Sequence, residues 1–362
     1  MLISSIKIKN FRNYRDFELK FAPAGALIFG NNGIGKTNLL EAISYFAFGR
    51  SFRTSKDSEI INFSEEYFRI EADFIINNQD YTFQAASDKT RKIIKLNDMN
   101  IARISELYKY LKVVYFSPGD LEIISGSPIY RRSFIDQAVS QYSFEYIENL
   151  RKYKRILKQR NALLKTDYLA KEKRIWDKQF ADIAAKIIRL RIKYLELFTP
   201  LLEKYYKTIS GSKEKFMAEY QYSFPNSDSD IADNLLDHLL EIETQEKHQE
   251  RTLAGPHLDD IGLFIDDHPA RNFSSQGQQR SIAIAMRLVQ NDLIIEKDQD
   301  TPILMFDDVL AELDDKRAKR IVNALEGNHQ IFISTPNISH YRSFGLKEID
   351  LKNELERKNE TQ

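Results

Sequence analysis

A short glycine-rich segment near the N-terminus has the spacing of a phosphate-binding loop. Residues 30–37 read GNNGIGKT and match the pattern GxxxxGK[ST] between an apolar run and a helix-like stretch. In such loops consecutive backbone N–H groups surround phosphate at a helix N-terminus. The lysine contacts the β- and γ-phosphates, and the threonine hydroxyl binds Mg²⁺. The sequence therefore predicts binding of ATP and Mg²⁺ by Gly30, Asn31, Asn32, Gly33, Ile34, Gly35, Lys36, Thr37 and Asn38.

Paired carboxylates at the end of an apolar run are the second candidate for this chemistry. The run Ile303–Phe306 is followed directly by Asp307 and Asp308, as in a Walker B motif. Asp307 is predicted to bind the Mg²⁺ ion, and Asp308 to polarise the attacking water, with Lys36 as the other catalytic residue. A buried strand that ends at an acidic turn is common, so the pair becomes specific only together with the phosphate loop.

A third motif, SSQGQQ at residues 274–279, precedes a predicted long helix. It is similar to the signature of ABC-type ATPases, in which the serine and the following N–H groups contact a γ-phosphate held by the opposite subunit. Ser275, Gly277 and Gln278 are the corresponding nucleotide-binding residues here. Taken alone, the hexapeptide is more typical of a serine N-cap followed by a glycine turn. Its position before Asp307, with 311–314 (AELD) following as a candidate D-loop, favours the ATPase interpretation.

Composition excludes several other kinds of site. The 362 residues include no cysteine, so disulfides, iron–sulfur clusters, thiolate zinc sites and cysteine nucleophiles are ruled out. The six histidines show no metal-ligand spacing. No run approaches 18 apolar residues, and the N-terminus has no recognisable export signal. We therefore expect a cytoplasmic protein without a membrane partner.

Charge is balanced overall but strongly segregated. Lysine plus arginine and aspartate plus glutamate each total 53, yet residues 151–193 contain 15 basic and only four acidic residues. A surface of this kind can bind nucleic-acid phosphates although the whole chain is neutral. The alternative to DNA binding is that these charges only keep the exposed face of a coiled coil solvated. We favour DNA binding, with these candidate contacts: Arg151, Lys152, Lys154, Arg155, Lys158, Arg189 and Lys193.

The basic segment falls within a predicted pair of long helices. Apolar side chains recur there in steps of four and three, as in a coiled coil, at Trp176, Phe180, Ile183, Ile187, Leu190, Tyr194, Leu197 and Leu201. Similar spacing upstream predicts an antiparallel hairpin over about residues 142–207, turning near 167–171, with a longer arm of roughly 50 Å.

Strand-like patterns surround this helical segment on both sides. Strands are expected in the first 30 residues, at 68–76, 81–86, 113–116, 303–306 and 331–334. The predicted fold is α/β: an ABC-type ATPase head with a mixed sheet and phosphate loop, formed by residues 1–117 plus 252–362. A helical lobe at 118–251, carrying the short antiparallel coiled coil, is inserted into it.

Together these motifs resemble the RecF family, short-armed relatives of the SMC proteins. Besides the ATP motifs, the resemblance depends on NFRNY at 10–14, GRSFRT at 49–54, the stretch 118–136 ending in RRSFID, and GPHLDD at 255–260. It implies ATP-dependent dimerisation at gapped DNA or single-strand/double-strand junctions, where the family works with RecO and RecR to load RecA during repair. It also implies a nucleotide contact by Arg12. ATP hydrolysis is then expected to be weak, stimulated by DNA and used as a switch.

Three positions depart from ABC ATPases in general. Gln276 stands where many signatures have glycine, Asp308 replaces the usual glutamate, and Thr335 replaces the switch histidine of transporters. These departures predict slow hydrolysis used for timing. The alternatives are an SMC-like chromosome-organising ATPase, a transporter motor subunit, and a structural coiled-coil protein with a vestigial ATP site. The short arms disfavour an SMC-like protein, and the missing histidine disfavours a transporter subunit. The intact ATP motifs disfavour a vestigial site.

Several charged residues in the family-like motifs have two possible roles. Arg50, Arg53, Arg131 and Arg132 could contact DNA or pair with acidic side chains, and His257 could lie at a nucleotide or subunit interface.

Overall fold

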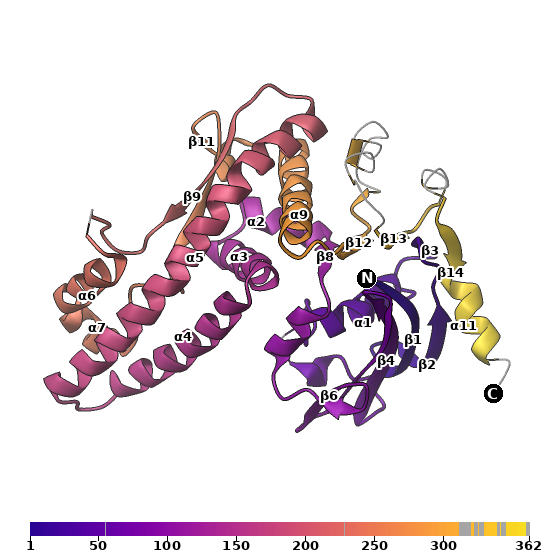
Figure 1. Ribbon diagram of the computed structural model, residues 1–362, viewed down its shortest axis with the longest axis horizontal. Coiled ribbons are helices and arrows are strands. Elements are labelled where there is room, and N and C mark those ends of the chain that lie inside the picture. Colours follow the sequence, from indigo (N-terminus) through magenta and orange to yellow (C-terminus); the bar gives the residue numbers. More distant parts are fainter. Residues whose placement is uncertain are drawn as a thin grey trace. The chain divides into compact units, whose positions relative to one another are not determined.

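The computed structural model of the chain describes residues 1–54, 56–227, 229–310, 320–321, 325, 329–338, 341 and 345–359. The chain forms two compact units, Met1–Pro118 with Gln290–Gln362, and Gly119–Val289 (Figure 1). The first division lies next to the predicted boundary at 117/118. The second lies well after 251/252, because the strand at Asp260–Ile265 pairs within the second unit.

The first unit begins with an antiparallel sheet. Its strand order is β2-β1-β4-β5-β6-β7. The alternating apolar residues of β1 and β4 face inward, as their period-two pattern predicts. The strands are β1 (Leu2–Phe11), β2 (Tyr14–Lys20), β4 (Tyr67–Ile76), β5 (Gln79–Asp88), β6 (Lys92–Leu96) and β7 (Met99–Asn100).

A separate parallel sheet in the same unit bears the nucleotide motifs. Its order is β14-β3-β13-β12-β8, from β3 (Gly25–Phe29), β8 (Val113–Phe116), β12 (Ile303–Asp307), β13 (Ile331–Thr335) and β14 (Lys347–Asp350). Every pairing in it is parallel, so the carboxyl ends of its strands lie along one edge. The α/β expectation is therefore confirmed, with parallel and antiparallel strands in separate sheets.

Helix α1 (Lys36–Phe48) follows β3 and joins the two sheets into one core. It is almost entirely buried, as its run of apolar residues predicts, and it contacts β8, β12 and β13. Phe46 of α1 packs edge-to-face on Phe74 of β4 at a centroid distance of 5.9 Å. The unit also contains short 3₁₀ turns at Asp57–Glu59 and Ile104–Lys109, and helix α11 (Leu351–Asn359).

The second unit is mainly helical. A 3₁₀ turn at Pro118–Asp120 leads into its helices α2 (Leu121–Ser125), α3 (Pro128–Tyr142), α4 (Phe144–Leu163), α5 (Ala170–Ser210), α6 (Ile231–Glu241), α7 (Glu243–Gln249) and α8 (Ala270–Phe273). Helix α9 (Gln276–Asp298) begins in this unit. A small antiparallel sheet joins β9 (Phe216–Gln221), β10 (Asp260–Ile265) and β11 (His268–Pro269).

Helices α4 and α5 form the predicted antiparallel hairpin (Figure 1). At 1.5 Å per residue, the 41 residues of α5 extend about 60 Å, more than the expected 50 Å. The predicted seam is wrong beyond Tyr194: Leu197 is exposed, whereas Phe198 and Leu202 are buried. Because α5 also contacts β9 and α6, its buried face follows the 3.6-residue period of an ordinary packed helix. Every helix in the described part of the chain is too short or too polar to span a lipid bilayer.

Candidate nucleotide-binding site

The phosphate loop connects the carboxyl end of β3 to the first turn of α1. Gly35, which precedes the helix, has φ +117°, and a Cβ there would lie 2.6 Å from the Asn13 side-chain nitrogen. Only glycine fits this left-handed, closely approached position. Lys36 is buried, and its Nζ donates to the carbonyl oxygens of Gly30 at 2.9 Å and Asn31 at 3.3 Å. The loop thus encloses its own lysine ammonium group.

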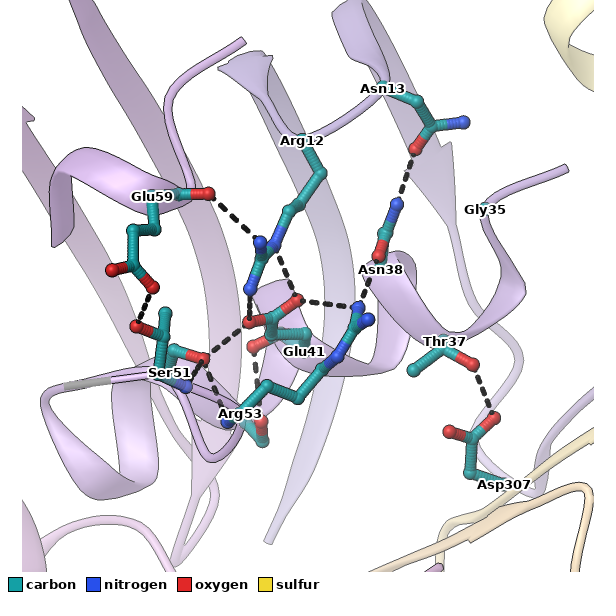
Figure 2. Close-up of polar contacts among 12 residues, drawn as sticks. Arg12, Asn13, Gly35, Thr37, Asn38, Glu41, Ser51, Arg53, Glu59 and Asp307 are labelled. Carbon is teal, nitrogen blue, oxygen red and sulfur yellow. Dashed lines mark hydrogen bonds and ion pairs between the residues drawn. The ribbon is translucent and has the colours of Figure 1, made fainter. Parts of the chain in front are cut away.

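Thr37 and Asp307 meet as the motif pair requires. The Thr37 hydroxyl donates to Asp307 Oδ1 at 3.0 Å (Figure 2). Two further hydroxyls, which sequence reasoning did not find, donate to the same buried carboxylate. Ser334 Oγ reaches Oδ1 and Tyr115 Oη reaches Oδ2, each at 2.6 Å. Both lie on strands recognised in the sequence, but only the pairing of β12 with β8 and β13 places them beside Asp307.

Asp308 lies immediately beyond β12 in a left-handed conformation with φ +55°. Its backbone N–H lies 3.2 Å from both the carbonyl oxygen and the hydroxyl oxygen of Ser334. Aspartate tolerates this region better than longer side chains do. The backbone therefore gives a physical reason for aspartate where transporter ATPases have glutamate.

A buried carboxylate on α1, Glu41, gathers charged side chains from both family-like N-terminal motifs. Arg12 donates from Nε to Oε2 at 3.0 Å and from Nη2 to Oε1 at 2.7 Å. Ser51 also donates to Glu41, and Arg53 Nη1 lies 3.6 Å from Oε2 (Figure 2). Arg12, a predicted nucleotide ligand, is therefore an ion-pair partner in this structure, and its contact with nucleotide remains a prediction.

Hydrogen bonds link this cluster to the phosphate loop. Asn13 donates to the carbonyl oxygen of Ile34, Asn38 donates to Asn13, and Arg53 donates to Asn38, at 2.8, 2.8 and 2.9 Å. The segments 10–14 and 49–54 thus both contact the motif at 30–38. Of the two roles considered for Arg53, the structure shows pairing with an acidic side chain.

The predicted signature residues lie in the second unit, at the N-terminus of α9. Ser275 N–H donates to Gln278 Oε1 at 2.8 Å, and Gln278 N–H donates to Ser275 Oγ at 3.3 Å. These two hydrogen bonds form a capping box. Ser275 is therefore the N-cap of α9, as the hexapeptide alone predicts. Ser275 is exposed, and Gly277 occupies the first turn of the helix. The candidate D-loop at 311–314 lies outside the described residues.

The switch position of transporters, Thr335, lies at the buried end of β13. Its hydroxyl donates to the carbonyl oxygen of Asn337 at 2.9 Å. Its described hydroxyl contacts are therefore within its own turn.

The motifs at 131–136 and 255–260 contact each other in the second unit. Arg131 binds Asp260 through Nε and Nη2, both at 2.8 Å, and Arg132 donates to the carbonyl oxygen of Asp259 at 3.1 Å. Asp136 accepts from Arg191 of α5 at 2.8 Å. Pairing within the protein is thus the observed role of Arg131.

His257 lies inside this cluster. Its Nδ1 is 2.6 Å from the hydroxyl of Tyr153, and its Nε2 is 3.3 Å from the carbonyl oxygen of Thr252. Burial, assisted by nearby arginines, lowers the His257 pKa from 6.5 to about 4. His257 is therefore neutral at physiological pH and structural in this arrangement.

The basic hairpin divides into exposed and buried charges. Arg160, Lys173 and Arg191 are buried; Arg160 binds both Asp177 and Glu246, and Lys173 binds Asp177. All seven predicted DNA contacts are exposed: Arg151, Lys152, Lys154, Arg155, Lys158, Arg189 and Lys193. Two of these, Arg151 and Arg189, also form surface ion pairs.

Comparison with known proteins assigns the family. The family model described as "RecF/RecN/SMC N terminal domain" matches residues 2–344. The chain is 36% identical over 357 residues to "DNA replication and repair protein RecF" of Heliobacterium modesticaldum (strain ATCC 51547 / Ice1), covering 96% of this chain and 95% of that protein. The same-named protein of Halalkalibacterium halodurans is 34% identical, with 93% of each chain covered.

Solved structures agree with this assignment. "Structure of the recombination mediator protein RecF-ATP in RecFOR pathway" matches with a TM-score of 0.87 at 33% identity, over 93% of this chain and 92% of that one. An SMC head bound to a ScpA domain matches with a TM-score of 0.53 at 17% identity, over 93% of this chain and 90% of that one, which shows a shared fold. The chain has the fold of an ABC-type ATPase head and belongs to the RecF family of DNA replication and repair proteins.

Proposed function

We propose that this protein is an ATP-gated DNA-binding protein of recombinational repair. It binds ATP, dimerises at gaps or single-strand/double-strand junctions, and helps RecO and RecR load RecA. The observation that supports this most directly is the 3.0 Å contact of Thr37 with Asp307 beside an intact phosphate loop. The solved relative named with ATP in the RecFOR pathway supports the same ligand.

The residues present fit Mg²⁺. The Thr37 hydroxyl and the Asp307 carboxylate are hard oxygen donors, which Mg²⁺ prefers together with nucleotide phosphates. Thr37 and Asp307 are the residues that would hold the ion, which when bound neutralises charge on the phosphates. Lys36 binds phosphate oxygens in place of the carbonyls of Gly30 and Asn31, and Asp308 accepts a proton from the attacking water.

ATP acts here as a switch because its site is divided between subunits. Ser275 is exposed at the N-terminus of α9, where a second subunit can reach it. The first turn of a 23-residue helix attracts negative charge. Ser275, Gly277 and Gln278 of one subunit therefore bind the γ-phosphate on the other, and slow hydrolysis releases the pair.

DNA binds the outer face of α4. Arg151, Lys154, Arg155 and Lys158 recur at helical spacing on an exposed stripe, whose first member, Arg151, is paired with Glu148. Lysine and arginine on such a stripe neutralise phosphates without reading base sequence. The other exposed candidates are Lys152 of α4 and, on α5, Lys193 and Arg189, which pairs with Asp230 before α6.

The direct test is fluorescence anisotropy of a labelled gapped duplex titrated with the protein in ATP and in ADP. Tighter, salt-sensitive binding with ATP is the expected result. Lys36→Ala should remove the ATP-dependent part and leave the ADP curve unchanged. Equal affinity with ATP and ADP in the unchanged protein would contradict ATP gating.

A further inference from the structure

The carboxylate of Asp307 is held on both of its oxygens by hydroxyl groups. Oδ1 accepts from Thr37 and Ser334, and Oδ2 accepts from Tyr115 at 2.6 Å. These three hydroxyls are the carboxylate's partners in the described part of the chain. Thr37 and Ser334 both approach Oδ1, so among the described residues Tyr115 is the one that holds Oδ2.

The sheet register explains why Tyr115 can reach Asp307. Tyr115 of β8 is paired with Met305 of β12, and Asp307 lies two residues further along β12. Side chains two residues apart share a face of a strand, so Tyr115 and Asp307 are diagonal neighbours on one face of the sheet. A long aromatic side chain is needed to span this diagonal with a hydroxyl at its end.

The Tyr115 ring is itself fixed. The side chain is buried, and Phe52 packs on it at a centroid distance of 4.0 Å with an interplanar angle of 35°. Phe52 belongs to the GRSFRT segment, whose Ser51 and Arg53 contact Glu41. The Tyr115 hydroxyl is therefore placed by packing before any ligand binds.

We propose that Tyr115 is a positioning residue for Mg²⁺: its hydroxyl fixes Oδ2 of Asp307, so that the other carboxylate oxygen is presented beside Thr37. This inference rests on the proposed ATP and Mg²⁺ site and adds a residue to it. Partners that orient a metal ligand typically change metal affinity by 10- to 100-fold when they are removed.

Calorimetric titration of ATP, at graded MgCl₂ and in EDTA, tests the proposal with Tyr115→Phe. This change removes one oxygen atom and keeps the ring against Phe52. The Mg²⁺ concentration that gives half of the magnesium-dependent gain in ATP affinity should rise about tenfold. ATP affinity in EDTA should stay within about twofold of the unchanged protein, since the phosphate loop is intact.

Two further variants separate positioning from general stability. Tyr110→Phe removes a tyrosine hydroxyl in the same unit and should leave both measurements unchanged. Phe52→Leu keeps the Tyr115 hydroxyl but loosens its ring, and should raise the Mg²⁺ midpoint by a smaller factor.

An unchanged Mg²⁺ midpoint in Tyr115→Phe, or an equal loss of affinity in EDTA and in MgCl₂, would overturn the proposal. If Tyr115→Phe does not fold, an unchanged Mg²⁺ midpoint in Phe52→Leu would overturn the proposal instead. Failure of the underlying function looks different: the unchanged protein would not bind ATP, or Lys36→Ala would bind it equally well.

Discussion

Arg12 and Glu41 are joined by two parallel hydrogen bonds, of 3.0 and 2.7 Å, around a carboxylate that is completely buried. Arg12 comes from the turn after β1, and Glu41 from the second turn of α1. A residue predicted to bind nucleotide is thus also part of the interior of the ATPase unit. Its two roles must be separated experimentally.

Arg12→Leu should lower the free energy of unfolding by about 2–3 kcal/mol, because it leaves Glu41 with less compensation in a buried site. Arg53, 3.6 Å from Glu41, still compensates part of that charge, so the loss is at or below the lower end of the range of about 3–5 kcal/mol for broken buried pairs. Urea denaturation without nucleotide measures the effect. The double variant Arg12→Leu/Glu41→Gln should recover at least half of the loss, and additive losses would contradict a direct coupling.

Ser275→Arg should block ATP-dependent dimerisation while the monomer still binds ATP. The bulky cation would occupy the exposed N-terminus of α9, and loss of the cap costs only about 1 kcal/mol of helix stability. Analytical ultracentrifugation with ATP measures the pairing, and calorimetry measures the binding. Ser229→Arg, on an exposed loop, is the matched control. Loss of ATP binding in the Ser275 variant would argue against a site divided between subunits.

Asp308→Asn should slow ATP hydrolysis by about 10²–10⁴-fold, the usual contribution of a general base, without weakening ATP binding. Asparagine accepts the φ of +55° at this position, so the backbone is preserved. The ATP-bound dimer should therefore last longer. Single-turnover phosphate release is the measurement, and an unchanged rate would remove Asp308 from the reaction.

His257 should make stability depend on pH. Its pKa is lowered from 6.5 in the unfolded chain to about 4 in the folded protein, so the unfolded chain takes up the proton first as pH falls. The contribution is fully present above about pH 6.5 and is lost progressively towards pH 4. Between pH 7 and pH 5 the unchanged protein should lose about 2 kcal/mol more than His257→Gln in urea denaturation. Equal losses would mean that His257 is accessible to protons in the folded state.

Arg155→Ala/Lys158→Ala should weaken DNA binding equally for all sequences. Removal of two phosphate contacts should reduce the slope of log affinity against log salt by about two. Lys89→Ala/Arg91→Ala, in the exposed turn after β5, removes the same charge and should have no effect. An unchanged salt slope in the α4 variant would place the DNA elsewhere.

Local sequence pattern was sufficient for much of the first unit. Alternation located β1 and β4, and the motif spacing paired Thr37 with Asp307 across 270 residues of sequence. These features depend on neighbours along the chain or on a chemistry with fixed residue types. Tyr115, Ser334 and Glu41 escaped prediction because each acquires its role only when the strands pair or the motifs converge.

The α4–α5 hairpin was predicted less accurately than the first unit. A heptad pattern predicts one partner helix, yet α5 also packs against β9 and α6, and its seam shifts after Tyr194. Charge type was equally incomplete as a guide. The upstream heptad spacing places Arg160 in the seam and Arg155 outside it. It does not identify the partners that compensate the buried Arg160 charge, which are Asp177 and Glu246, the latter 86 residues away.

The ion pair between Arg160 and Glu246 lowers the net positive charge of the α4–α5 hairpin. Glu246 lies within residues 228–250, where acidic residues outnumber lysine and arginine, and with Asp177 it neutralises the buried Arg160. These acidic residues therefore do more than repel DNA, because one of them, Glu246, holds α7 against α4 through its ion pair with Arg160. The positive charge that DNA phosphates can contact is therefore smaller than the total for residues 151–193, because Arg160, Lys173 and Arg191 are buried. The remaining basic side chains lie on the exposed surface of a hairpin that these buried ion pairs hold together.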